Sequence, residues 1–209
     1  MATTIRKAAT AAAALLFSGL LFAPTADAAP PRSSTVPRTA AGAPQARSAQ
    51  STYGPFRIRA VHSGKCLDVA GGTSATGDGA DVFQWTCLGA AQTNQQWYLT
   101  DAGDGTYYIR ARHSGKCLDV AGGTSATGDG ADVFQWTCLG AAQTNQRWYF
   151  NTEAVQNGKY TYYIRALHSG KCLDVEGGTS ATGDGANVFQ WTCLSTAQTN
   201  QRWYLEAVA

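Results

Sequence analysis

Almost every residue that could do chemistry in this chain lies in one segment that occurs three times. Residues 62–95 read HSGKCLDVAGGTSATGDGADVFQWTCLGAAQTNQ, and residues 113–146 repeat this string without a change. Residues 168–201 repeat it with substitutions only at Glu176, Asn187, Ser195 and Thr196. Each copy therefore offers histidine, cysteine, carboxylate, tryptophan and amide side chains, which suit a metal site, paired catalytic carboxylates or a polar binding pocket.

The arrangement of these residues does not favour catalysis. No nucleophile and base occur as a recognisable pair, and the glutamates Glu153, Glu176 and Glu206 are scattered along the chain. A glycosidase needs two carboxylates that flank one bond, and here they would have to come from the repeated aspartates. We therefore expect a protein that is not an enzyme and that needs no cofactor.

A metal site is not expected either. His62, His113 and His168 each precede a Ser-Gly turn, and they could bind a metal only if they converged, so we expect them at surface turns. The stretch Asp78-Gly79-Ala80-Asp81 resembles a cation-binding loop but lacks a full set of Ca²⁺ ligands. The third copy also has Asn187 in place of the second aspartate, which favours a solvated turn.

The segments around these residues predict short β-strands. Residues 56–60 alternate apolar and charged side chains, as a half-buried strand does. Further strands are expected at 65–69, 80–86 and 95–99, with a glycine-rich loop at 71–79, and the pattern recurs in each repeat. The third repeat follows a longer connector at 151–162, which we expect to be a loop. Three equal sets of strands predict an all-β, closed, pseudo-threefold fold, which needs no capping repeats.

All six cysteines lie within the repeats at the same spacing in each copy. Repeat symmetry favours a pairing in which every repeat closes its own loop. Zinc binding is the alternative, but these cysteines lack the short spacing that such sites use. The expected disulfides join Cys66 to Cys87, Cys117 to Cys138, and Cys172 to Cys193, and each loop of this length contributes about 3 kcal/mol in the chain-entropy model.

The first part of the chain has the features of an export signal. Residues 1–28 combine Arg6 and Lys7, an apolar run, and a small-residue cleavage site, Ala26-Asp27-Ala28. The alternative is a membrane anchor, but the apolar run is short for a helix that must span about 20 residues. We expect a signal peptide at 1–28, a disordered Pro/Ala/Ser-rich linker at 29–52, and a folded domain at 53–209, with repeats at about 53–100, 101–150 and 151–209.

The charge of the chain gives no support to one class of partner. The formal net charge is +2, from 16 basic and 14 acidic residues. A nucleic-acid-binding protein would show a basic patch or stripe, so no nucleic-acid partner is expected. We expect a secreted, extracellular monomer without a membrane span.

The repeats resemble a known family. Cys66-Leu67-Asp68-Val69, Trp85-Thr86-Cys87 and Asn94-Gln95-Gln96-Trp97 resemble the ricin-type β-trefoil lectin repeat, and the chain is similar to bacterial family 13 carbohydrate-binding modules. The resemblance covers residues 53–205. It implies a β-trefoil of twelve strands, six in a short barrel and six in a hairpin cap.

The resemblance also implies a shallow sugar site in each lobe. An aspartate accepts hydrogen bonds from sugar hydroxyls, an aromatic ring stacks on the pyranose face, and an asparagine adds a polar contact. These roles suit the residue types, because a carboxylate forms strong charge-assisted bonds and an amide both donates and accepts. The candidate carbohydrate-binding residues are Asp68, Phe83, Trp85 and Asn94; Asp119, Phe134, Trp136 and Asn145; and Asp174, Phe189, Trp191 and Asn200.

Each candidate has a simpler structural explanation. Asp68 could cap the turn into the glycine-rich loop, Trp85 could be a core residue, and Asn94 could be only a turn residue. Trp97 is expected in the core, with Gln95 satisfying buried backbone groups.

One position departs from the family pattern. Much of the family has glutamine two residues before the stacking aromatic, whereas this chain has Phe83 there and Gln84 one position later. If Val82 faces the core, strand alternation places Phe83 and Trp85 in the site and Gln84 inside, where it needs buried partners. The opposite register would bury Phe83 and Trp85 and remove the stacking role. We expect the first register.

These features predict a non-catalytic protein that is multivalent for a neutral glycan. The family suggests a polysaccharide that contains galactose or xylose. The alternative is an interaction protein on the same scaffold, such as a protease inhibitor, which would act through the unique segments 101–106 or 151–161.

Overall fold

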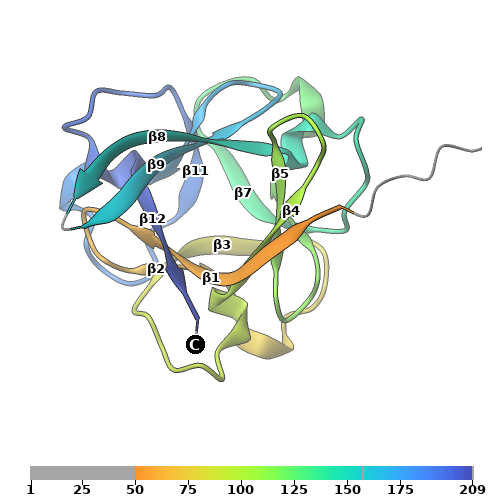
Figure 1. Cartoon of the computed structure of the whole chain (residues 1–209), viewed down its shortest axis with the longest axis horizontal. Coiled ribbons are helices and arrows are strands. Elements are labelled where there is room, and N and C mark those ends of the chain that lie inside the picture. The colour runs from red at the N-terminus through yellow and green to blue at the C-terminus, as the bar shows by residue number, and fades with distance from the viewer. Residues whose placement is uncertain (1–49, 157, 209) are drawn as a thin grey trace, which may run out of the picture. The chain divides into compact units, whose positions relative to one another are not determined.

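The computed structural model describes residues 50–156 and 158–208. The predicted signal peptide and all but the end of the predicted linker lie outside the described residues. Figure 1 shows three lobes around a central axis. The strands are β1 (Thr52–Ala60), β2 (Cys66–Val69), β3 (Ala80–Trp85), β4 (Trp97–Asp101), β5 (Tyr107–Ala111), β6 (Cys117–Val120), β7 (Ala131–Trp136), β8 (Trp148–Gln156), β9 (Lys159–Ala166), β10 (Cys172–Val175), β11 (Val188–Trp191) and β12 (Trp203–Ala207).

Six of these strands close a barrel. β1 pairs with β4, β4 with β5, β5 with β8, β8 with β9, β9 with β12, and β12 returns to β1. The other six form three hairpins, β2–β3, β6–β7 and β10–β11. The inner strands of these hairpins, β3, β7 and β11, contact one another through short pairings. A six-stranded barrel with a cap of three hairpins is the β-trefoil, so the fold prediction is confirmed.

The core lies inside the barrel and beneath the cap. Trp97, Trp148 and Trp203 are fully buried there, as expected from the Gln-x-Trp motif. Trp97 Nε1 donates to the carbonyl oxygen of Leu67 at 3.0 Å, which satisfies the one polar atom of the ring. The same bond recurs in the other lobes, from Trp148 to Leu118 and from Trp203 to Leu173.

The three expected disulfides are present. Each closes a loop within its own repeat, with Cα–Cα distances of 5.1, 5.2 and 5.1 Å. Each bridge joins the start of a cap hairpin's first strand to the residues just after its second strand. Because disulfides persist in oxidising compartments, the three bridges indicate an oxidising environment for this domain.

The structure differs from the sequence prediction in local detail. The expected loop at 151–162 is instead a hairpin, in which β8 and β9 pair as far as Gln156 and Lys159 and run side by side in Figure 1. This segment contains Thr152, Val155 and Tyr160, and β-branched and aromatic residues favour strands. The strand expected from residue 95 begins at Trp97, because Thr93–Gln95 form a turn of 3₁₀-helix.

Within residues 50–156 and 158–208, there is no helix of the length and apolar character that a bilayer crossing requires.

Candidate functional site

Each lobe gathers its candidate residues on one cap hairpin and the 3₁₀ turn that follows it. In the first lobe Asp68 lies on β2 directly opposite Phe83 on β3, and Trp85 ends β3. Asn94 lies in the turn Thr93–Gln95, which brings it back to the carboxylate of Asp68. Residues that are far apart in sequence thus converge, and the two other lobes repeat the arrangement.

The aspartate is buried and held from two sides. Asn94 Nδ2 donates to Asp68 Oδ1 at 2.8 Å, and Gln95 Nε2 donates to Asp68 Oδ2 at 2.6 Å. The equivalent bonds measure 2.8 and 2.6 Å at Asp119, and 2.7 and 2.6 Å at Asp174. Each carboxylate oxygen has two lone pairs, so each can accept a further hydrogen bond from a ligand.

Burial changes the acidity of these carboxyl groups. It raises the pKa of Asp68, and it raises the pKa values of Asp119 and Asp174 to about 6. The bonds from the neighbouring glutamine and asparagine oppose this rise because they stabilise the charged form. The carboxylates of Asp119 and Asp174 are therefore charged at neutral pH and take up protons in mildly acidic solution.

The aromatic residues of β3 have the expected register. Val82 is fully buried, Phe83 is half-buried, and Trp85 is 37% exposed. The ring centroids of Phe83 and Trp85 lie 5.5 Å apart, and the same pair recurs at 5.5 and 5.4 Å in the other lobes. Trp85 is thus not a core residue, and its ring is available to a flat apolar ligand face.

Gln84 points inward and finds the buried partners that this register requires. Its Nε2 donates to the carbonyl oxygens of Ala181 at 2.6 Å and Gly183 at 2.8 Å, and its Oε1 accepts from Ser63 Oγ at 2.8 Å. Ala181 and Gly183 belong to the glycine-rich loop of the third lobe. The glutamine that departs from the family pattern therefore joins two lobes together.

Asn94 is more than a turn residue. Its side chain is 3% exposed and contacts Asp68, while its Oδ1 atom has no hydrogen-bond partner among the described residues. Asn145 and Asn200 share this property. An unpaired buried carbonyl costs free energy, so each lobe has an acceptor that a ligand hydroxyl can satisfy.

In two lobes these residues line a distinct pocket. The second-lobe pocket has a volume of about 210 Å³ and is lined by Asp119, Phe134, Trp136 and Asn145, together with Leu139 and Gln143. The third-lobe pocket has a volume of about 360 Å³ and adds Glu176 to the equivalent set. The sequence prediction missed Leu139, Gln143 and Glu176 as pocket residues. The pattern of a single strand does not reveal which loop residues fold against it.

The orienting glutamine was also missed. Gln95 was expected only to satisfy buried backbone, and it does so by donating to the carbonyl oxygen of Thr86 and accepting from the amide of Leu88. The same amide group also fixes Asp68. The Gln-x-Trp motif was the available signal, since its glutamine directly adjoins the site asparagine.

The glycine-rich loop of one lobe supports the site of the next. Asp78 accepts from the amide of Thr137 at 2.7 Å and pairs with Lys116 Nζ at 2.7 Å. A methyl group on Gly79 would lie 3.7 Å from Trp136 Cζ3, so this backbone borders the tryptophan ring. The turn at Asp78 is exposed, as expected, and it also connects two lobes.

The three histidines contribute to the same contacts between lobes. His113 Nε2 donates to the carbonyl oxygen of Ala75 at 3.0 Å, and His62 and His168 form the equivalent bonds. The three side chains are half-buried. They lie at turns, as expected, but they also contact the neighbouring lobe. Among residues 50–156 and 158–208, no three His, Cys, Asp or Glu side chains are grouped so that they could hold a metal ion.

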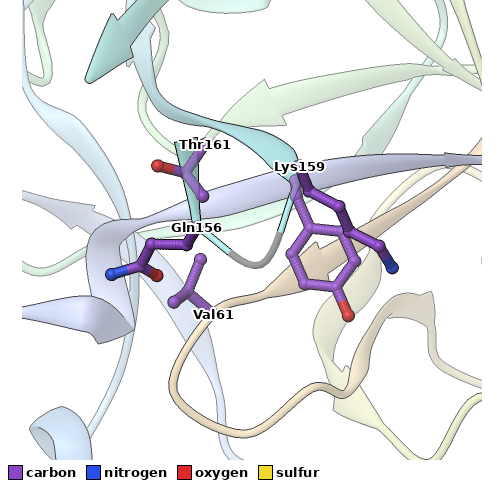
Figure 2. Close-up of a pocket in the computed structure, with 5 residues that line it drawn as sticks. Val61, Gln156, Lys159 and Thr161 are labelled. Atoms are coloured by element: carbon purple, nitrogen blue, oxygen red, sulfur yellow. The ribbon is translucent and has the colours of Figure 1, made fainter. Parts of the chain in front are cut away.

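A further pocket breaks the threefold symmetry. It has a volume of about 210 Å³ and lies where the β8–β9 hairpin approaches β12 (Figure 2). Lys159 Nζ lies 4.5 Å from the centre of the Tyr204 ring in this pocket. Its lining residues are Val61, Gln156, Lys159, Thr161 and Tyr204, none of which belongs to the repeated carboxylate–tryptophan set.

The sequence over residues 45–136 and 144–209 matches the family model described as ricin-type beta-trefoil lectin domain-like. The chain belongs to this family. It is similar to the crystal structure of the designed 3-fold symmetric protein ThreeFoil, with 44% identity and a TM-score of 0.62, over 75% of this chain and 100% of that chain.

Two natural proteins share the fold. An exo-beta-1,3-galactanase from Clostridium thermocellum is 33% identical with a TM-score of 0.61, over 74% of this chain but only 30% of its own length. The C-half of the earthworm R-type lectin, solved in complex with GalNAc, is 20% identical with a TM-score of 0.55, over 75% of this chain and 100% of that one. Membership of this lectin family indicates carbohydrate binding.

Proposed function

We propose that the protein is a secreted, non-catalytic lectin that binds a neutral polysaccharide through equivalent sites in its three lobes. One observation carries the proposal. In every lobe, a buried aspartate with free acceptor capacity lies opposite a phenylalanine, with a partly exposed tryptophan two residues further along the same strand. An asparagine oxygen that lacks a partner among the described residues lies beside the carboxylate. A sugar ring has hydroxyls on its edge and an apolar C–H face, which matches this combination.

The residues divide the work of binding. The carboxylate accepts two hydroxyl hydrogens in charge-assisted bonds, and Asn145 Oδ1 of the second lobe gains the partner that it lacks. Trp136 supplies a rigid flat surface with little conformational entropy to lose. Gln146 holds the carboxylate in place before the ligand arrives, which lowers the cost of binding because the site is already organised.

Galactose or xylose is the proposed sugar. An exo-beta-1,3-galactanase and a lectin in complex with GalNAc are among the similar structures, which favours galactose-containing glycans. A single shallow site of this kind is expected to bind with a Kd on the order of 1 mM. Three sites on one rigid body raise the affinity for a polymer through multivalency.

The test removes the stacking ring from all three lobes. Trp85→Ala, Trp136→Ala and Trp191→Ala are combined, and retention on galactan, arabinogalactan and xylan is compared with that of the unchanged protein by affinity electrophoresis. Because each ring is 37% exposed, the fold should survive, which circular dichroism checks. We expect retention to be lost.

A matched control lies on the symmetry-breaking hairpin. Tyr160 is 62% exposed and remote from the repeated motif, so Tyr160→Ala should leave polysaccharide retention unchanged. Loss of retention in this variant, with retention intact in the triple tryptophan variant, would instead place the interaction surface on residues 151–161. Full retention in the triple variant would reject the proposed sites.

A further inference from the structure

The third lobe differs from the other two at the edge of its pocket. Glu176 occupies the position that Ala70 and Ala121 hold in the first and second lobes. Its backbone amide donates to the carbonyl oxygen of Asn187 at 2.9 Å, and the alanines form the same bond at 2.8 and 2.9 Å. The backbone is therefore the same in all three lobes, and the side chain is the change.

The glutamate adds a second carboxylate to the pocket. Glu176 lines the third-lobe pocket together with Asp174, Phe189 and Trp191, and the lining contains no basic side chain. The second-lobe pocket has Asp119 as its one carboxylate and is smaller, at about 210 Å³ against about 360 Å³. The third lobe thus presents two acidic groups beside two aromatic rings.

The Glu176 carboxylate is not committed to another role. It is exposed, and it forms no hydrogen bond or ion pair with the residues that the structure describes. In contrast, the exposed carboxylate of Asp129 is occupied by Lys171 and Thr192. Asn200 in the same pocket is 3% exposed and has an Oδ1 atom without a partner in the described part of the chain. The Glu176 carboxylate and the Asn200 oxygen are therefore both available to a ligand in this pocket.

We propose that Glu176 makes the third lobe selective for a sugar that carries a protonated amine, while the first two lobes bind neutral sugars. An ammonium group donates charge-assisted hydrogen bonds to carboxylates and is attracted to the faces of aromatic rings. The carboxylates of Asp174 and Glu176 repel a sugar acid, because the charges have the same sign. This inference rests on the proposed lectin function, and it names the substrate class of one of its three sites.

The experiment isolates the third lobe. Trp85→Ala and Trp136→Ala remove the stacking rings of the other lobes, and binding of galactosamine and glucosamine is compared with binding of galactose and glucose by NMR titration near neutral pH. Glu176→Gln keeps the size of the side chain and removes its charge. Exposed ion pairs contribute up to about 1 kcal/mol, so we expect the Kd for the amino sugar to rise roughly three- to five-fold.

Three further measurements make the result specific. In Glu176→Gln the Kd for the neutral hexose should rise less than the Kd for the amino sugar, and added salt should reduce the preference for the amino sugar. Trp85→Ala and Trp191→Ala together leave the second lobe as the only one with its stacking ring. In that background, Ala121→Glu should create a preference for the amino sugar. These variants test gain and loss of the same interaction in two matched pockets.

The outcomes separate this inference from the lectin function. Equal weakening of amino and neutral sugars in Glu176→Gln, or no change in either, would overturn the selectivity while leaving sugar binding in place. Absence of binding by the unchanged protein to any of these sugars and to the three polysaccharides would overturn the lectin function itself.

Discussion

Each lobe contains two tryptophans that lie close in sequence but have opposite environments. In the second lobe Trp136 ends a cap strand with 37% of its surface exposed, whereas Trp148 is fully buried and donates to the carbonyl oxygen of Leu118 at 3.0 Å. The buried ring has a polar partner and contacts the core, and the exposed ring has neither. The comparison assigns Trp148 to the stability of the core and leaves Trp136 as the ring that we propose for binding.

The largest expected effect comes from removing the buried ring. Trp148→Ala should lower the free energy of unfolding by about 3–5 kcal/mol, because it creates a large cavity in the core and orphans the Leu118 carbonyl. Urea denaturation, followed by circular dichroism, measures this change. A loss below about 1 kcal/mol would break the assignment of this ring to the core.

A smaller effect on stability is expected at Gln146, which precedes Trp148 by two residues. Gln146 is fully buried, donates to Asp119 and to the carbonyl oxygen of Thr137, and accepts from the amide of Leu139. Gln146→Ala leaves these buried groups unpaired, which should cost about 1–3 kcal/mol of stability. It should also weaken sugar binding in this lobe, because the carboxylate loses its orientation.

The pH profile distinguishes orientation from packing in this variant. The bond from Gln146 lowers the pKa of Asp119, so its loss should raise that pKa above about 6 and move the pH dependence of binding upward. Gln143→Ala is the matched control, since Gln143 lines the same pocket without contacting the carboxylate. A loss of stability without a shift in the pH profile would limit Gln146 to a structural role.

The sequence was sufficient to predict the fold and the positions of most candidate residues within it. Identical repeats fixed the symmetry, equal cysteine spacing fixed the disulfides, and strand alternation around Val82 placed Phe83 and Trp85 on the side away from the core. These features depend on local pattern and on symmetry, and both can be read from one chain.

Contacts between lobes could not be predicted in the same way. Asp78 reaches Lys116 and Thr137 of the next lobe, and Gln84 reaches carbonyl groups of the third lobe. These bonds depend on how closed threefold packing brings each loop against its neighbour, which no spacing within one repeat reveals. The hairpin at 151–162 was missed because its sequence occurs only once and so lacks the support of repetition.

Acidity should weaken binding before it weakens the fold. Asp119 and Asp174 have pKa values of about 6 because they are buried, and the charged form is the better hydroxyl acceptor. Sugar affinity should therefore fall as the pH drops through 6, by roughly tenfold at one unit below the pKa if only the charged form binds. Isothermal titration across this range measures the effect.

The same two aspartates affect stability in the opposite direction: their contribution to the free energy of unfolding rises as the pH falls, whereas the sugar affinity falls. A carboxyl group with a raised pKa binds more protons in the folded than in the unfolded state, so its contribution increases as the pH falls from about 6 toward 3.8. Burial lowers the pKa values of His62, His113 and His168, and their contribution to stability is lost as the pH falls below 6.5.

The binding prediction has a clear contrary outcome. A sugar affinity that stayed constant between pH 7 and pH 5 would exclude the charged aspartates from the binding step.

The smallest effect on stability is expected from the exposed ring. Trp136→Ala should change the free energy of unfolding by less than about 1 kcal/mol, because the ring is partly in solvent and has no polar partner to orphan. The same variant should remove sugar binding from the second lobe, seen as the loss of NMR shifts at Asn145 on titration with galactose. Comparison with Trp148→Ala then tests the two roles directly, since each variant replaces a tryptophan of the same lobe by alanine. If Trp136→Ala destabilised the protein as much as Trp148→Ala, the contact between its ring and the Gly79 loop would be structural, and the two tryptophans would not divide stability from binding.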